Sequence, residues 1–214
     1  MKKLLLIGGG GHCKSVIDSL KSKYNEFDEI AIIDRNTTLV NQGIKVIGKD
    51  QDLKYLFSKG YNYAFITVGS VGNPSVRIKL YNLIKKIGYI IPTIIDKSSI
   101  VSSNAELCEG VFVGKGAIIN AGTKIGNCSI INTGVVVEHD CKIGSFVHVA
   151  PGSVLCGNVQ VGNNSHIGAN ATVIQGMQVG KNSIVGAGTV VIHSIGDEAT
   201  VIGNPGRMKG EDNI

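Results

Sequence analysis

The chain has 214 residues, a formal net charge of +5 and only 5% aromatic residues, with no Trp. No apolar run approaches the roughly 20 residues of a membrane-spanning helix, and Leu4–Ile7 is too short for a secretory signal, so we expect a cytoplasmic protein without a membrane part. Basic residues are not interleaved with aromatic ones, which argues against nucleic acid as a partner. The five cysteines show no CxxC spacing, so neither disulfides nor a metal site are predicted.

The N-terminal stretch has the order strand, glycine loop, helix. Residues 3–7 form an apolar run, four consecutive glycines follow, and residues 14–23 have helical spacing. Glycines let a backbone approach a phosphate closely, and a helix N-terminus favours negative charge. A second strand, 29–34, ends at Asp34, about 20 residues beyond the glycines, as in Rossmann-like folds. Cys13 replaces the third glycine of the dinucleotide fingerprint, which disfavours a NAD site.

Alternating helices and strands continue to the end of this first part. The pattern predicts a helix at 52–59, a strand at 63–68 and an amphipathic helix at 75–87. Because helices and strands alternate, we expect a parallel sheet. Gly88 closes the last helix. The α/β Rossmann-like domain is therefore placed at residues 1–94.

From residue 95 onward, every sixth residue is aliphatic without a slip in phase. Neither the helical period of 3.6 nor the strand period of 2 produces a strict period of six, which requires short strands broken by regular turns. The fifth residue of each unit is usually small, and the second is often Gly. The aliphatic series is Ile95, Val101, Leu107, Val113, Ile119, Ile125, Ile131, Val137, Ile143, Val149, Leu155, Val161, Ile167, Val173, Val179, Val185 and Val191.

This hexapeptide repeat predicts a β-helix. Each unit lays down one short strand, the aliphatic residue points inward, and Gly or Asn adopts the turn conformation with positive φ. Each coil buries its apolar residues only against the coils above and below it. A long unbroken run is therefore what stability requires.

With this repeat behind a glycine-loop domain, the chain resembles the left-handed β-helix acyltransferases. More narrowly, it resembles the bacterial sugar acetyltransferases that include the sialic acid O-acetyltransferases and the UDP-amino-sugar N-acetyltransferases. The resemblance covers essentially the whole chain. It implies an all-β left-handed parallel β-helix with a C-terminal tail over residues 95–214, with about 18 residues per coil. It also implies acetyl-CoA as co-substrate and a homotrimer with acetyl-CoA between adjacent β-helices.

One hexapeptide departs from the usual turn composition, because it places His139 beside Asp140. Histidine is the general base most easily operated near neutral pH, and a neighbouring carboxylate orients such a ring. The resemblance implies that His139 is the catalytic base and Asp140 its acidic partner. Cys141 occupies a place in the unit that normally points inward, so a covalent acyl-enzyme is not expected.

The coil length also relates the other histidines to His139. With about 18 residues per coil, His148 and His166 stack on the same face, about 4.8 Å apart. His139 lies nine residues, or half a coil, from His148. The two can therefore face one ligand only if a second subunit completes the site.

Small residues form a column on successive coils at Pro151, Ala169 and Ala187. They leave a shallow groove parallel to the axis, wide enough for a pantetheine arm. The resemblance implies that His148, Ala169 and Ala187 contact acetyl-CoA, and that Asn132 lies near the acceptor sugar.

The resemblance also implies that the N-terminal domain holds the nucleotide part of a sugar nucleotide. The matching positions are Gly10, Gly11, His12, Asp34, Arg35 and Gly69. The alternative interpretation is that His12 and Asp34 only stabilise the loop or cap the helix N-terminus. The expected function is N-acetylation of a UDP-linked 4-amino sugar in bacterial surface glycan biosynthesis, by direct transfer from acetyl-CoA.

Three other functions remain open at this point. A sialic acid O-acetyltransferase needs the same base. A zinc-dependent β-helix enzyme would use His139, His148 and His166, but their spacing shows no set converging on one point. A non-catalytic nucleotide-sugar scaffold is the third.

Near the C-terminus, Arg207 and Lys209 either contact the phosphates of CoA or belong to a solvated tail.

Overall fold

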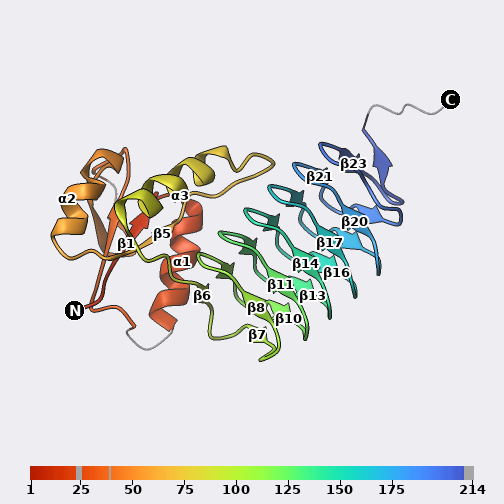
Figure 1. Ribbon diagram of the computed structural model, residues 1–214, viewed down its shortest axis with the longest axis horizontal. Helices are drawn as coiled ribbons and strands as arrows, with labels where there is room; N and C mark the ends of the chain where they lie inside the picture. The colour runs from red at the N-terminus through yellow and green to blue at the C-terminus, as the bar shows by residue number, and fades with distance from the viewer. Residues whose placement is uncertain (23–25, 39, 210–214) are drawn as a thin grey trace.

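The computed structural model describes residues 1–22, 26–38 and 40–209. An α/β layer occupies one end of the long axis and a stack of coils the other (Figure 1). The N-terminal sheet has the strand order β3-β4-β2-β1-β5. Its strands are β1 (Lys3–Ile7), β2 (Glu29–Ile33), β3 (Val40–Asn41), β4 (Ile44–Gly48) and β5 (Tyr63–Ile66).

Helices cover both faces of this sheet, because alternate strand residues are apolar in both directions. Leu4 and Leu6 pack with the first helix, whereas Leu5 and Ile7 pack with the later ones. The helices are α1 (Gly11–Ser22), the 3₁₀ turn η1 (Asp50–Asp52), α2 (Leu53–Ser58) and α3 (Ser75–Ile87).

The predicted elements of this part are largely confirmed. Strands β1, β2, β4 and β5 are parallel, and α3 has the predicted bounds. The first helix begins at Gly11 rather than at residue 14, and the predicted residue 23 lies outside the described residues. The hairpin of β3 and β4 was not predicted from the sequence. Its strands are short and partly exposed, so their apolar pattern is weak.

The second part is a left-handed parallel β-helix, as predicted. Its first face consists of β6 (Ile94–Ile95), β9 (Phe112–Val113), β12 (Ile130–Ile131), β15 (His148–Val149), β18 (His166–Ile167), β21 (Ile184–Val185), β23 (Thr200–Ile202) and the antiparallel β24 (Arg207–Met208). The second face consists of β7 (Ile100–Val101), β10 (Ile118–Ile119), β13 (Val136–Val137), β16 (Val154–Leu155), β19 (Thr172–Val173) and β22 (Val190–Val191). The third face consists of β8 (Glu106–Leu107), β11 (Lys124–Ile125), β14 (Lys142–Ile143), β17 (Gln160–Val161) and β20 (Gln178–Val179). Pairing partners such as Ile118 and Val136 differ by 136 − 118 = 18 residues, which is one coil.

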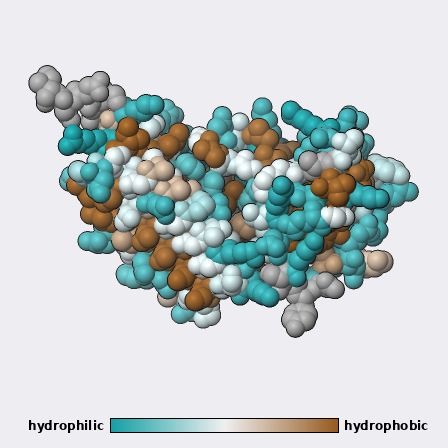
Figure 2. All heavy atoms as spheres, turned by 180° about the vertical axis from the view of Figure 1, so that it is seen from behind, coloured by the Kyte–Doolittle hydropathy of each residue, from teal (hydrophilic) through white to brown (hydrophobic). Residues whose placement is uncertain are grey.

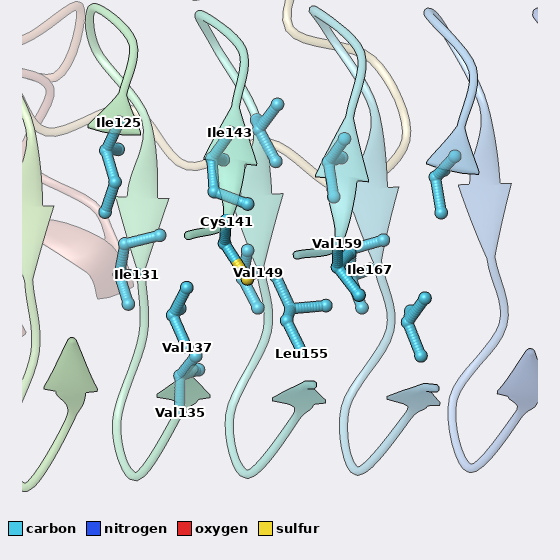
Figure 3. Packing of buried hydrophobic residues seen from close by; sticks show 14 of the residues in the cluster. Ile125, Ile131, Val135, Val137, Cys141, Ile143, Val149, Leu155, Val159 and Ile167 are labelled. Carbon is cyan, nitrogen blue, oxygen red and sulfur yellow. The ribbon is translucent and has the colours of Figure 1, made fainter. Parts of the chain in front are cut away.

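The aliphatic residue of each repeat points into the coil, where it packs against its counterparts above and below (Figure 3). Positive φ recurs every sixth residue from Gly110 to Gly188, mostly on Gly and Asn. The glycines in the second place of the unit serve a different need. At Gly126, an added Cβ would lie 2.6 Å from the backbone nitrogen of Ser145 on the next coil. Close backbone stacking, rather than left-handed φ, therefore requires glycine there.

The α/β layer packs directly on the first coils of the β-helix. Ser19 Oγ on α1 donates to Asp96 Oδ2 at 2.6 Å, and Lys115 Nζ lies 3.0 Å from Asp18 Oδ2. The start of β6 at Ile94 is compatible with the domain boundary proposed at residue 94, which stays a prediction. In the described ranges, no helix is long and apolar enough to cross a bilayer.

Candidate active site

The predicted base and its acidic partner lie at the corner between the second and third faces, directly after β13. His139 Nδ1 is 2.9 Å from Asp140 Oδ2. Asp140 has a positive φ of 61°, a conformation shared at this corner by Gly122, Asn158 and Gly176 and one that Asp tolerates better than most residues. The side chains of His139 and Asp140 are 63% and 67% exposed in the single chain.

This contact determines which nitrogen of His139 is available for chemistry. A carboxylate only accepts hydrogen bonds, so the Asp140 contact favours the tautomer with the proton on Nδ1. Nε2 then carries the free lone pair of the neutral ring. It can accept a proton from a group that approaches the corner from solvent.

Asn132 and His148 contact each other on the first face, away from that corner. Asn132 Nδ2 donates to His148 Nε2 at 3.2 Å, and His148 Nδ1 donates to the Ser70 carbonyl at 2.5 Å. Burial lowers the pKa of His148 to about 4, so the ring is neutral at pH 7. Both ring nitrogens are thus occupied, and no N–H of His148 remains to donate to an oxyanion.

The predicted stack of two histidines is confirmed. His148 pairs with His166 in register on β15 and β18, with ring centroids 5.0 Å apart. Burial lowers the pKa of His166 as well. In the described part of the chain, no group of three or more His, Cys, Asp or Glu side chains is arranged to hold a metal ion.

Ala169 and Ala187 stack on successive coils at the corner between the first and second faces, as the spacing predicted. The Gly188 N–H donates to the Ala169 carbonyl at 2.8 Å, and Ala187 is exposed. A groove of about 630 Å³ runs along the third face and includes neither this column nor His139. The column and His139 therefore occupy different corners of one chain, and their contact with acetyl-CoA stays a prediction.

A cavity of about 290 Å³ lies at the carboxyl ends of β1, β2 and β5, the usual ligand position in doubly wound sheets. The predicted Asp34 and Arg35 line it. Both carboxylate oxygens of Asp34 accept backbone N–H groups, from Gly9 at 2.6 Å and Asn36 at 2.8 Å. Asp34 thus makes the loop contacts of the alternative interpretation, and each oxygen keeps a second lone pair for a ligand.

Sequence reasoning missed other residues of this cavity, namely Ile7, Gly8, Ile33, Asp50, Val68, Val76 and Leu80. Two of these residues could have been found from the sequence, because they come shortly after predicted or observed strand ends. Asp50 shortly follows β4 and Val68 shortly follows β5, at the sheet edge where ligands bind.

The remaining predicted substrate positions divide into two groups. Gly10 and Gly11 are exposed at the N-terminus of α1, with open space where a Cβ would lie. His12 packs edge-on against Phe112 of the β-helix, with ring centroids 5.1 Å apart, and Gly69 lies beside it. Burial, with the charges of Arg77 and His148, lowers the pKa of His12 to about 3.

The His12 ring therefore lies between the two parts of the chain, not in the 290 Å³ cavity. Its Nε2 is shielded from solvent and has no partner among the described residues. At the other end of the molecule, Arg207 lines a cavity of about 680 Å³ together with His193, whereas Lys209 is exposed outside it. The roles predicted for these residues stay predictions.

Known proteins and structures resemble the chain over both parts. The PglD N-terminal domain family matches residues 3–84, and the bacterial transferase hexapeptide family matches residues 122–157 and 140–175. GDP-perosamine N-acetyltransferase from Caulobacter crescentus, solved as a histidine-to-alanine variant with CoA and GDP-perosamine, is 38% identical, with a TM-score of 0.92 over 99% of this chain and 98% of that one. The chain belongs to the hexapeptide-repeat sugar acetyltransferases. It is therefore an acyltransferase.

Two further structures of sugar acetyltransferases agree with this assignment. The acetyltransferase domain of PglB from Neisseria gonorrhoeae, in complex with acetyl coenzyme A, is 33% identical, with a TM-score of 0.90 over 97% of this chain and 98% of that one. WeeI from Acinetobacter baumannii is 27% identical, with a TM-score of 0.86 over 97% of this chain and 100% of that one. Comparison with curated protein sequences gives no match.

Proposed function

We propose that this acetyltransferase moves the acetyl group of acetyl-CoA to the amine of a nucleotide-linked 4-amino sugar, with His139 as general base. The observation that carries the proposal is the held imidazole, with Nδ1 on Asp140 and a side chain that is 63% exposed. The similarity to structures with acetyl coenzyme A and with CoA and GDP-perosamine supports the donor and the acceptor class.

The proposed reaction requires His139 to accept one proton and later to return it. The acceptor nitrogen attacks the thioester carbonyl carbon and forms the N–C bond, while Nε2 takes the proton that the nitrogen loses. The negative Asp140 stabilises the resulting imidazolium. When the C–S bond breaks, the imidazolium returns the proton to the departing sulfur. The histidine is then neutral again, and no covalent enzyme intermediate forms.

For the nucleotide, we propose that the cavity at Asp34 and Arg35 holds the base and ribose, with the phosphates near the open N-terminus of α1. A helix N-terminus with exposed glycines suits a diphosphate. Uridine is our first choice of nucleoside. Guanosine is the second, because the 38% identical relative was solved with GDP-perosamine.

Calorimetric titration with UDP, GDP, CMP and free sialic acid tests this assignment. We expect a nucleoside diphosphate to bind, and Arg35→Ala to weaken binding about tenfold or more because the side chain lines the cavity. Lys54→Ala is the matched control, since Lys54 is an exposed cation of the same domain outside the cavity. The same titration with His12→Ala checks the predicted role of that ring. Binding of CMP or sialic acid alone would instead favour O-acetylation of sialic acid.

We further propose a homotrimer whose subunits meet along the second face. The outward side chains of this face are almost all aliphatic, whereas those of the third face are charged or amide side chains. In the order of the coils, they are Ile100, Ile118, Val136, Val154, Thr172 and Val190, against Glu106, Lys124, Lys142, Gln160 and Gln178. Figure 2 shows apolar residues in a diagonal row across the coils, at the place of β7, β10, β13 and β16. A continuous apolar strip of this kind is typical of a protein interface.

The corners beside the second face explain why a trimer would complete the site. One corner of this face bears His139, and the other bears Ala169 and Ala187. With second faces around a threefold axis, the His139 corner of one subunit lies next to the Ala169 corner of its neighbour. The two half-sites that one chain separates are then combined.

A charge introduced on the second face tests this assembly. Val154→Asp places a carboxylate in the apolar strip, and we expect the mass in solution to fall from three times the 22.5 kDa chain mass to that of a single chain, with loss of turnover. Gln160→Asp, on the third face, should leave a trimer. Light scattering after size exclusion measures both. A wild-type protein that runs as a monomer would contradict the proposal.

A further inference from the structure

Gly157 lies at the same corner as His139, one coil further along the axis. The column at this corner reads Ala121, His139, Gly157, so the histidine is placed between the two smallest side chains. The coils are joined there by hydrogen bonds from Asp140 N–H to the Ala121 carbonyl and from Asn158 N–H to the His139 carbonyl, both at 2.9 Å.

The imidazole of His139 occupies the space that a side chain at position 157 would need. A Cβ added to Gly157 would lie 2.6 Å from His139 Nε2 and 2.7 Å from Cε1. Its φ is outside the left-handed region, so the backbone itself does not require glycine. At Gly126 and Gly162, by contrast, the nearest atoms to an added Cβ are backbone atoms of the next coil. Stacking of the coils therefore explains those glycines but not Gly157.

The backbone around Gly157 cannot easily move away from the ring. Its carbonyl accepts the Gly176 N–H at 2.9 Å, and the next residue, Asn158, is bonded to the His139 carbonyl. A methyl group at position 157 would thus be accommodated by rotation of the exposed imidazole. That rotation would take Nδ1 out of reach of Asp140.

We propose that Gly157 is a positioning residue for the catalytic base: the missing side chain lets the His139 ring lie against the next coil with Nδ1 on Asp140 and Nε2 toward the acceptor. The inference rests on the proposed function of His139. Two contacts then hold the ring, a carboxylate at Nδ1 and a glycine backbone below Nε2.

Gly157→Ala tests the inference. We expect kcat to fall about 10- to 100-fold because the base is misplaced, with the KM values for both substrates within about twofold. Gly196→Ala is the matched control, since Gly196 has ordinary φ and no atom within 4 Å of an added Cβ. In the His139→Ala background, Gly157→Ala should change kcat less than twofold, because no ring remains to displace. If Gly157→Ala alone lowers the thermal midpoint, adding His139→Ala should restore the midpoint, because the clash with the ring is then removed.

Failure of the inference and failure of the proposed function give different results. If His139→Ala abolishes turnover but Gly157→Ala keeps the wild-type kcat, only the positioning role is overturned. If His139→Ala keeps the wild-type kcat, the proposed base is wrong and the inference falls with it. Crystal structures of the wild type and of Gly157→Ala need no substrate: a displaced imidazole supports the inference, and an unmoved ring in contact with Asp140 overturns it.

Discussion

Replacement of His139 by alanine should lower kcat by about 10²- to 10⁴-fold, the usual contribution of a general base. Nε2 of His139 carries the lone pair that accepts the proton, and the other ring nitrogen, Nδ1, is held 2.9 Å from Asp140 Oδ2. Without it, the acceptor nitrogen must lose its proton to water. Because the ring is 63% exposed and packs into no core, folding should be unaffected. Release of the CoA thiol from acetyl-CoA, with UDP- and GDP-linked 4-amino sugars as acceptors, measures the rate.

The chain contains a matched control for this variant. His193 lies in the same corner column, three coils later, and is also exposed. His193→Ala should keep kcat within about twofold, since no carboxylate holds its ring among the described residues. The kcat of Asp140→Asn should lie between those of His139→Ala and His193→Ala, because the amide keeps a hydrogen bond but not the charge that stabilises the imidazolium. Retention of at least half the wild-type kcat by His139→Ala would refute the assignment of the base.

The second large effect is expected at Arg77, the buried cation between the two parts of the chain. The residue is 1% exposed, and burial lowers the pKa of Arg77 to about 10. Its guanidinium donates to the carbonyls of Ile66 at 3.1 Å, Val68 at 2.5 Å and Cys128 at 2.7 Å. The first carbonyl is at the end of β5, the second is in the loop that follows β5, and the third belongs to the β-helix. One side chain therefore ties the nucleotide-binding edge of the sheet to the coils.

Arg77→Met should cost about 3 kcal/mol of unfolding free energy, because two buried carbonyls and one part-buried carbonyl lose their donor at about 1–3 kcal/mol each. For a chain of this size, that corresponds to a fall of about 6–12 °C in the thermal midpoint. Calorimetric melting measures the fall. Lys79→Met, an exposed change on the same helix, should shift the midpoint by less than about 2 °C. Equal melting of the two variants would show that Arg77 does not hold the parts together.

The β-helix could be predicted because its signal is local and repeated. A strict period of six places one aliphatic residue inside each turn, and any slip would expose a whole column. The N-terminal elements followed from ordinary strand and helix periodicity. The hairpin of β3 and β4 did not, since two short, half-exposed strands at a sheet edge bury too little apolar area to impose a pattern.

The candidate site was predictable where residues adjacent in sequence act together. The pair His139 and Asp140 is visible in the sequence, and the structure confirms their contact. Asp34 and Arg35 follow a strand end, and the structure places both at one cavity. The contact of His148 with the Ser70 carbonyl joins residues 78 positions apart. No local pattern indicates such a contact.

The sequence by itself determined the six-residue repeat and its inward aliphatic column. With the coil of about 18 residues that the family resemblance implies, the residue numbers also indicate the corner on which each functional residue lies, and the structure keeps this spacing through β22. Only the tertiary structure decided what the neighbouring coil and the packed domain do to those residues. His12 and His148 became buried, neutral rings between the two parts. Arg77 became the donor to three carbonyls, and Gly157 became the surface on which the His139 ring lies. Such effects depend on which segments stack in space, and that is set by the closure of the whole fold rather than by any short stretch of chain.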